Sequence, residues 1–230
     1  MKFVSAFVAA VVCAVSFAPQ EADAHAFLLN PKAQFTTNKM NYYAYVVDGN
    51  KVPPFSSYTT GNAERNSQGF KANYKKLNPK SLKDFILRNQ QRATGSDIPP
   101  GGTAECGFSK PNIAPLPLPN AIEFGNYNLQ NRDGLHPGPC EAWCDNEIVI
   151  PFTEDCRTRF NKPIPYDKSK CVGKKRFTFY WLATHFAPFQ VYIGCAPIGG
   201  SRSLDNDDDD DDSYSEANNS TLIDSEPGWE

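Results

Sequence analysis

The chain has few histidines, no internal repeat and no long hydrophobic run. Its 230 residues contain only three histidines, His25, His136 and His185. A histidine metal site would therefore have to draw on widely separated parts of the sequence. The main apolar run, residues 3–17, is too short to span a bilayer. These absences exclude a repeat architecture and a membrane-spanning helix in this run.

The apolar run has the features of a secretory signal peptide. One basic residue, Lys2, precedes it, and Ala22 and Ala24 satisfy the small-x-small pattern that signal peptidase reads. Cleavage after Ala24 would leave His25 as the first residue of the mature protein. We therefore expect residues 1–24 to be a leader and the protein to be secreted and extracellular.

The net charge of -3 conceals two parts of opposite charge. Residues 25–200 carry 21 Lys and Arg against 13 Asp and Glu, whereas residues 201–230 carry one Arg against eleven acids. The acidic block at 205–212 cannot bury itself, so we expect 201–230 to be a disordered tail. The basic body favours polyanionic partners, which outside a cell means acidic polysaccharide or anionic surfaces before nucleic acid. Ordinary surface lysine without a partner is the alternative.

Six cysteines follow the leader, and an even number in a secreted chain predicts three disulfides. The sequence does not determine how Cys106, Cys140, Cys144, Cys156, Cys171 and Cys195 pair. The spacing from Cys140 to Cys144 also allows a zinc site, which an oxidising compartment disfavours.

Most of the regular structure that the sequence predicts is β-strand. Runs rich in aromatic and β-branched residues predict strands at 26–30, 43–47, 121–124, 147–152, 176–183 and 189–195. Ser81 followed by Asp84 predicts the start of one short helix, which stops before Gly95. The polar segment 56–78 has little periodicity and predicts a long loop. Prolines and glycines predict a second loop over 98–119, which a disulfide of Cys106 would tether. This pattern indicates an all-β fold, an antiparallel β-sandwich.

The chemistry of His25 depends on the cleavage. A free N-terminal histidine carries an α-amino group and an imidazole Nδ1, which together close a chelate ring that no internal histidine can make. These groups titrate near pH ~8 and ~6.5, so a metal can displace both protons at neutral pH. The alternative is that His25 follows the leader by chance.

The segments around the other two histidines are also informative. Proline and glycine restrict the backbone around His136, so a ligand histidine there would need little reordering. His185 follows the strand at 176–183, and alternation in the next strand puts Gln190 and Tyr192 on one face. A phenol can occupy an axial position beside a metal, and an amide can hydrogen-bond an oxygen species. A hydrogen-bonded loop histidine and a buried tyrosine are the alternatives.

Together these segments resemble the lytic polysaccharide monooxygenases, secreted copper enzymes that cut polysaccharide chains by oxidation. The resemblance rests on His25 after the cleavage site, on residues 136–144 (HPGPCEAWC) and on residues 185–195 (HFAPFQVYIGC). It covers residues 25–197 and is closest to the oomycete branch that acts on pectic homogalacturonan.

The resemblance implies an immunoglobulin-like or fibronectin-like β-sandwich over residues 25–200 and a histidine brace for one copper ion. The α-amino nitrogen and Nδ1 of His25 and a ring nitrogen of His136 would be ligands, with Tyr192 axial. His185 and Gln190 would position the co-substrate, oxygen or hydrogen peroxide, and supply protons. An external reductant would convert Cu(II) to Cu(I). We expect a monomer that acts on polyanionic pectin, without a nucleic-acid or membrane partner.

Three nearby aromatic residues, Trp143, Tyr180 and Trp181, are candidates for sacrificial electron donors in such an enzyme. Core packing is the alternative for all three. Two other functions also stay open. A non-catalytic copper carrier would keep His25 and His136 but would not need the other site residues. A secreted module that binds acidic glycans without chemistry would make His25 accidental.

Overall fold

The computed structural model describes residues 25–40, 42–52, 62–126, 135–185 and 187–199. The expected leader, residues 1–24, and the expected acidic tail, residues 201–230, lie outside the described residues. Within those ranges the chain is mostly antiparallel β-sheet with two α-helices.

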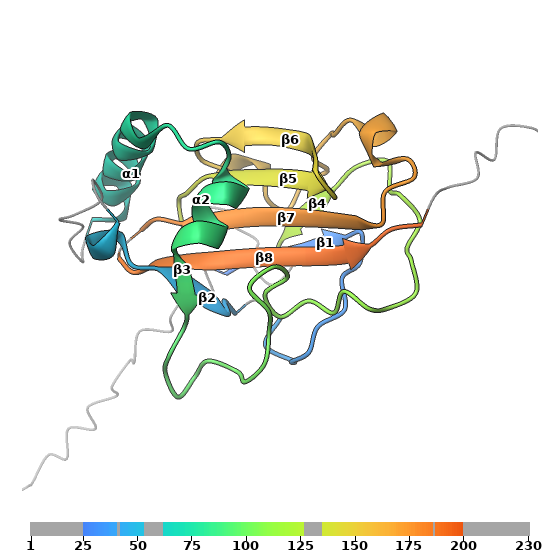
Figure 1. Ribbon diagram of the computed structural model, residues 1–230, viewed down its shortest axis with the longest axis horizontal. Helices are drawn as coiled ribbons and strands as arrows, with labels where there is room; N and C mark the ends of the chain where they lie inside the picture. Colours follow the sequence, from blue (N-terminus) through green and yellow to red (C-terminus); the bar gives the residue numbers. More distant parts are fainter. Residues whose placement is uncertain (1–24, 41, 53–61, 127–134, 186, 200–230) are drawn as a thin grey trace, which may run out of the picture. The chain divides into compact units, whose positions relative to one another are not determined.

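Two sheets make up the framework (Figure 1). The larger sheet has the order β3-β2-β8-β7-β5-β6, and the smaller sheet pairs β1 with β4. The strands are β1 (Phe27–Asn30), β2 (Tyr45–Val47), β3 (Gln90–Arg92), β4 (Glu123–Gly125), β5 (Cys140–Cys144), β6 (Glu147–Thr153), β7 (Arg176–Ala183) and β8 (Phe189–Pro197).

All six predicted strands are present, with small shifts at their ends. The sequence did not predict β3 and β5. β3 is a short polar strand of three residues, Gln90–Arg92, and β5 directly follows a segment of proline and glycine. Residues 98–119 form the predicted loop, because the described backbone there makes only isolated bridges.

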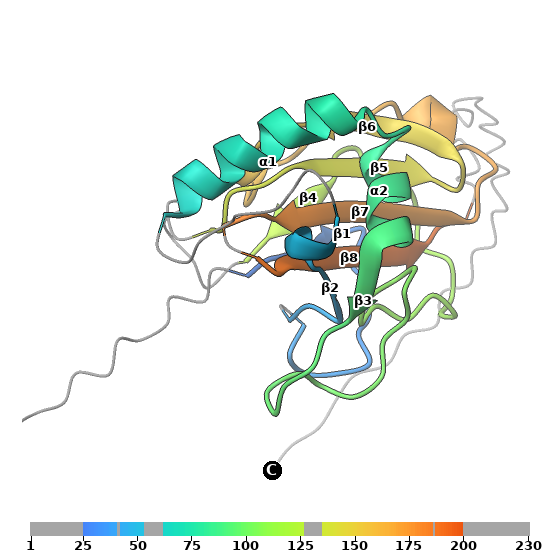
Figure 2. The same ribbon diagram turned by 60° about the vertical axis from the view of Figure 1, so that its left-hand side comes forward.

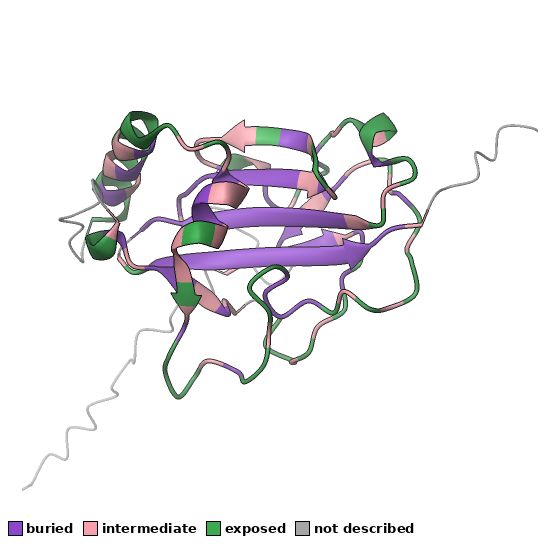
Figure 3. Cartoon of the chain, in the orientation of Figure 1, coloured by how far each residue is buried: buried purple, intermediate pink, exposed green. Residues whose placement is uncertain are grey.

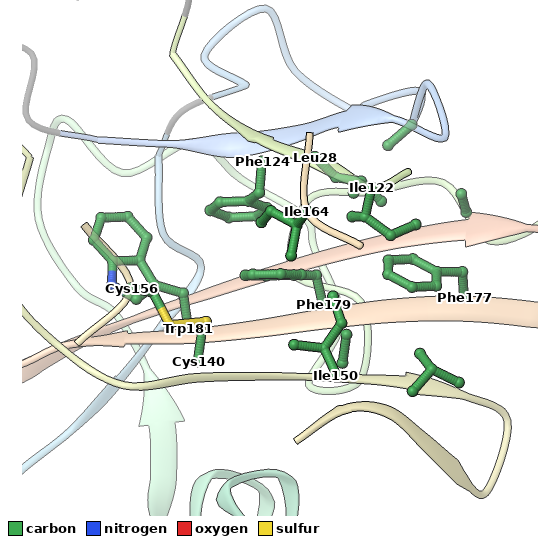
Figure 4. Packing of buried hydrophobic residues seen from close by; sticks show 14 of the residues in the cluster. Leu28, Ile122, Phe124, Cys140, Ile150, Cys156, Ile164, Phe177, Phe179 and Trp181 are labelled. Carbon is green, nitrogen blue, oxygen red and sulfur yellow. A yellow bond between two sulfur atoms is a disulfide. The ribbon is translucent and has the colours of Figure 1, made fainter. Parts of the chain in front are cut away.

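Both faces of the larger sheet are covered, because alternate residues of β7 belong to different cores. Phe179 and Trp181 belong to the core that contains Phe124 of β4, and the rings of Phe124 and Phe179 stack at 4.3 Å (Figure 4). Tyr180 and Leu182 face the opposite core, which contains aromatic residues of the helices. Figure 3 shows that β7 and β8 are buried along nearly their whole length.

The helix α1 (Ala63–Leu77) corrects the prediction of a loop over residues 56–78. Asn62 caps its start by accepting a hydrogen bond from the Arg65 N–H, at 2.9 Å. Its buried residues are Asn66, Phe70 and Tyr74, spaced four apart. The helical period is hidden in the sequence because one member of this stripe is polar and most other positions are polar too. Residues 53–61 lie outside the described residues.

The helix α2 (Leu82–Asn89) begins where the sequence predicts, and the Ser81 hydroxyl accepts a hydrogen bond from the Asp84 N–H at 2.9 Å. The buried carboxylate of Glu141 in β5 accepts two further bonds, from the Leu82 and Lys83 N–H groups, each at 3.2 Å. A carboxylate at a helix N-terminus is favourable because it satisfies free donors there. Figure 2 shows α2 crossing the larger sheet and α1 lying beside β6.

Three disulfides confirm the prediction from the cysteine count. They join Cys106 to Cys195, Cys140 to Cys156, and Cys144 to Cys171. The zinc alternative for Cys140 and Cys144 is wrong, because each sulfur is bonded to a different cysteine. Within the described ranges, no helix is long and apolar enough to cross a membrane.

We predict that Phe70→Ala lowers the free energy of unfolding by about 3–5 kcal/mol, because this fully buried ring packs against Phe85 and Phe189. Leu77→Ala is the matched control in the same helix, since Leu77 is 40% exposed, and it should change stability by less than about 0.5 kcal/mol. Urea denaturation followed by circular dichroism measures both values. Equal effects would show that α1 does not pack as described.

Candidate metal centre

The three histidines, which are far apart in the sequence, lie together at one end of the larger sheet. The ring centroids of His25 and His136 are 5.6 Å apart. The rings of His136 and His185 stack at 3.6 Å with an angle of 8° between their planes. The ring of Tyr192 lies 5.6 Å from that of His25. The structure therefore brings together the residues that the sequence singled out.

His136 is positioned because its loop is attached to the end of β7. The carbonyl of Pro137 accepts a hydrogen bond from the Thr184 N–H at 2.8 Å, and that of Pro139 accepts one from the Leu182 N–H at 3.0 Å. Between them, Gly138 has φ 154°, and a Cβ there would overlap the Leu182 carbonyl oxygen. Only glycine allows the backbone to approach β7 this closely. The two hydrogen bonds on either side of Gly138 then hold the backbone beside His136 in place.

His185 lies just beyond the end of β7 and is 5% exposed. Asn66 of α1 donates a hydrogen bond from its side-chain amide to the His185 carbonyl, at 2.6 Å. This contact joins the helix that the sequence did not predict to the centre of the candidate site. The side chain of His185 supports the His136 ring by stacking on it.

Gln190 and Tyr192 lie on the same face of β8, as alternation predicts, and both are buried. The Tyr192 hydroxyl donates a hydrogen bond to Gln190 Oε1 at 2.8 Å. A buried tyrosine with a bonded hydroxyl is common in protein cores. Here the pair lies beside His25, so the phenol and the amide are fixed relative to the imidazoles.

The three candidate electron donors have different surroundings. Trp181 is fully buried and stacks on Tyr192 with ring centroids 4.4 Å apart. Tyr180 belongs to the other core, on the helical side of the sheet. Trp143 packs on that side as well, and its Nε1–H donates to Glu141 at 2.6 Å. Of the three, Trp181 is the one in contact with a candidate site residue.

His25 is half-buried among aromatic rings. Tyr42 and Tyr43 contact its imidazole edge-on, at 5.6 and 6.1 Å between ring centroids. Its carbonyl accepts a hydrogen bond from the side-chain amide of Asn126, at 3.0 Å. The first residue of the expected mature protein is therefore held by both its ring and its backbone.

Burial keeps the imidazoles neutral. The pKa of His136 is lowered to about 3, first by burial and then by the neighbouring His185 and His25. The pKa of His185 is lowered to about 4 by burial and by His25. A neutral imidazole has a lone pair available for a metal, so no proton has to leave these rings at neutral pH.

The donor set fits copper. Among the described residues, no three His, Cys, Asp or Glu side chains are grouped so as to hold a metal ion. A histidine brace does not need three side chains, because two imidazoles and the α-amino nitrogen that the expected cleavage would free at His25 would complete it. Nitrogen ligands of this kind suit Cu(II), which also binds most strongly among the divalent first-row metals.

Basic residues of the body lie both near the histidines and away from them. Six basic residues lie within 162–176, at the start of β7, whereas His185 follows its other end (Figure 1). Near the histidines, the ammonium group of Lys39 lies over the ring of Tyr42 at 4.7 Å from its centroid. Only part of the charge is therefore close to the candidate site.

Sequence reasoning missed Asn66 and Asn126, the two buried asparagines that hold histidine carbonyls. Asn66 falls within the segment that the sequence assigned to a loop, and Asn126 directly follows a short strand. A single asparagine at such a position carries no motif. A helical prediction for α1 would have shown Asn66 on its buried stripe, but its partner is 119 residues away.

Comparison of the chain with models of protein families, with curated proteins and with solved structures finds no match. The case for a metal site therefore rests on the arrangement of His25, His136 and His185 with Gln190 and Tyr192.

We predict that metal-free protein loses stability as the pH falls from 6.5 to about 4. The pKa values of His136 and His185 are lower in the folded state, so the unfolded state binds more protons over this range and is favoured. His185→Gln should reduce this slope, because one such group is removed. Melting temperatures measured with a chelator from pH 4 to 7.5 test this. Parallel curves for wild type and variant would contradict it.

Proposed function

We propose that the protein is a secreted copper-dependent lytic polysaccharide monooxygenase. Its proposed substrate is a plant cell-wall polysaccharide, homogalacturonan. The observation that carries this proposal is the meeting of His25 and His136 beside His185, Gln190 and Tyr192. These residues come from three distant segments, and they are the ones the family resemblance selects.

The arrangement of the sheets supports the proposed fold. Phe124 of β4 stacks on Phe179 of β7, so the smaller sheet packs against one face of the larger one. We take this as an immunoglobulin-like or fibronectin-like β-sandwich with two helices on the outer face. The three disulfides support secretion, since such bonds persist in oxidising compartments.

Copper, cycling between Cu(II) and Cu(I) with an external reductant, would supply the one-electron chemistry by which oxygen or hydrogen peroxide oxidises a C–H bond of the polysaccharide. His25 and His136 would hold it through their imidazole nitrogens and the α-amino nitrogen of His25. His185 keeps the plane of the His136 ring fixed by stacking. The side-chain oxygen of Gln190 accepts a hydrogen bond from the Tyr192 hydroxyl. The N–H groups of the same amide are the donors that would bind a co-substrate.

The charge near the site supports an anionic substrate. Lys39 is exposed, and its ammonium lies over Tyr42, the ring that contacts His25. One of its N–H groups donates to the Asp97 carbonyl at 3.1 Å. A partly exposed tyrosine with an exposed lysine ammonium over its ring suits a sugar that carries a carboxylate. Neutral cellulose or chitin offers that ammonium no charged partner.

We predict that mature, copper-loaded protein with a reductant releases oxidised oligosaccharides from de-esterified homogalacturonan. Cellulose and chitin are assayed in parallel, and mass spectrometry identifies the products. Substitution of a residue that only supports a metal ligand lowers metal affinity by roughly 10–100-fold. His136→Ala removes a ligand itself, so it should lower copper affinity by at least that factor. Gln190→Ala should keep copper bound and lower turnover.

The outcomes separate the alternatives. Tight copper binding without oxidised products from any polymer would favour the non-catalytic carrier. A glycan-binding module would be favoured if the affinity for homogalacturonan were the same with and without copper, and the same with one extra residue before His25. Absence of copper binding by the mature wild type would overturn the proposal.

We also predict that Lys39→Gln lowers kcat/KM on de-esterified homogalacturonan by about two- to fivefold, which corresponds to one exposed charge interaction. The loss should shrink at high salt and on methyl-esterified polymer. Lys175→Gln is the matched control, because Lys175 lies at the opposite end of β7 and is exposed as well. Equal losses for both variants would show that the charge near His25 has no special role.

A further inference from the structure

The backbone of His25 is held by a side chain rather than by the sheet. β1 begins at Phe27, which pairs with Gly125 of β4. Asn126 is the residue directly after Gly125, and its amide donates to the His25 carbonyl at 3.0 Å. The contact between the β1 and β4 segments therefore continues beyond the paired strands, to the residue that the expected cleavage would make the N-terminus.

Asn126 is itself firmly placed. It is 1% exposed, and its backbone N–H donates to the side-chain oxygen of Asn161 at 2.7 Å. Asn161 has a left-handed backbone, with φ 55°, and its N–H donates to the Phe124 carbonyl at 3.0 Å. A Cβ at Gly125 would overlap Asn161, so the closeness of these segments depends on glycine.

The His25 carbonyl matters because it is one of the two attachments, with the imidazole, that together determine where the α-amino nitrogen points. In an N-terminal residue, rotation about the Cα–C bond turns the amino group relative to the rest of the chain. Terminal residues are poorly ordered unless something ties them down. The hydrogen bond from Asn126 fixes the peptide plane that follows the His25 Cα, and the contacts with Tyr42 and Tyr192 fix the imidazole. With both of these groups held, Cα is fixed between them, and the α-amino nitrogen has one direction relative to Nδ1.

We infer that Asn126 is a positioning residue for the α-amino ligand of the copper site. It acts through the His25 backbone and touches neither substrate nor copper. This inference rests on the proposed function, because it assumes that copper is held by the cleaved N-terminus. It adds a role for a residue that the sequence pattern did not select.

The test uses Cu(II) alone as the probe and mature full-length protein. Copper affinity is measured by competition with a chelator, and the electron paramagnetic resonance spectrum reports the ligand geometry. Asn126→Ala and the isosteric Asn126→Asp should each lower affinity by about 10–100-fold and change the spectrum. Asn30→Ala is the control, because Asn30 makes the same kind of contact, to the Ala121 carbonyl, at the other end of β1.

A second background separates positioning from a general loss of structure. Each variant is also made with one extra residue before His25, which turns the α-amino nitrogen into an amide. In that background Asn126→Ala should leave the residual copper affinity unchanged. Circular dichroism and the melting temperature without metal establish that the variants fold.

The possible results are distinct. Equal losses of affinity in the mature and extended backgrounds, or wild-type affinity and spectrum in the mature Asn126 variants, would overturn the inference. Failure of mature wild type to bind Cu(II) tightly would instead overturn the proposed function. A loss confined to the mature background establishes the positioning role.

Discussion

The antiparallel pairing of β7 with β8 is the contact on which the rest of the structure depends. It places Trp181 opposite Tyr192 and Ala183 opposite Gln190. His185 follows the end of β7, so it lies at the same end of the sheet as the Gln190 and Tyr192 pair. β5 pairs with the other edge of β7, which brings the segment of the second histidine to the same place. Two core layers then cover the faces of this pair.

Local patterns predicted six of the eight strands and the start of α2, because these depend on neighbouring residues, and the cysteine count predicted the number of disulfides. The three histidines that lie together were singled out from the sequence because histidine is rare in the chain, and the roles expected for them come from the family resemblance. The helix α1 was not predicted, because Asn66 occupies a position where an apolar residue would have shown the period. The contacts of Asn66 and Asn126 with distant carbonyls depend on tertiary structure, which no local pattern contains.

The two ends of the larger sheet differ in character. At the histidine end, rings stack closely and burial keeps imidazoles uncharged. The segment 162–176, which leads to the other end of β7, carries six basic residues, and its cations pair in part with Glu147, Asp167 and Glu105. Near the histidines, the ammonium group of Lys39 lies over the ring of Tyr42.

The burial of the disulfides has a consequence for the choice of electron source. The six disulfide-bonded cysteines are each at most 1% exposed, whereas His25 and His136 are only partly buried. Thiol–disulfide exchange requires a thiolate to reach the sulfur, so burial slows it. A small diffusing reductant, even a thiol, would thus reach the histidine end well before it opened the covalent links that hold β5 and β8. By access alone, the fold would therefore let a reductant act on the proposed copper site while the buried disulfides stay intact.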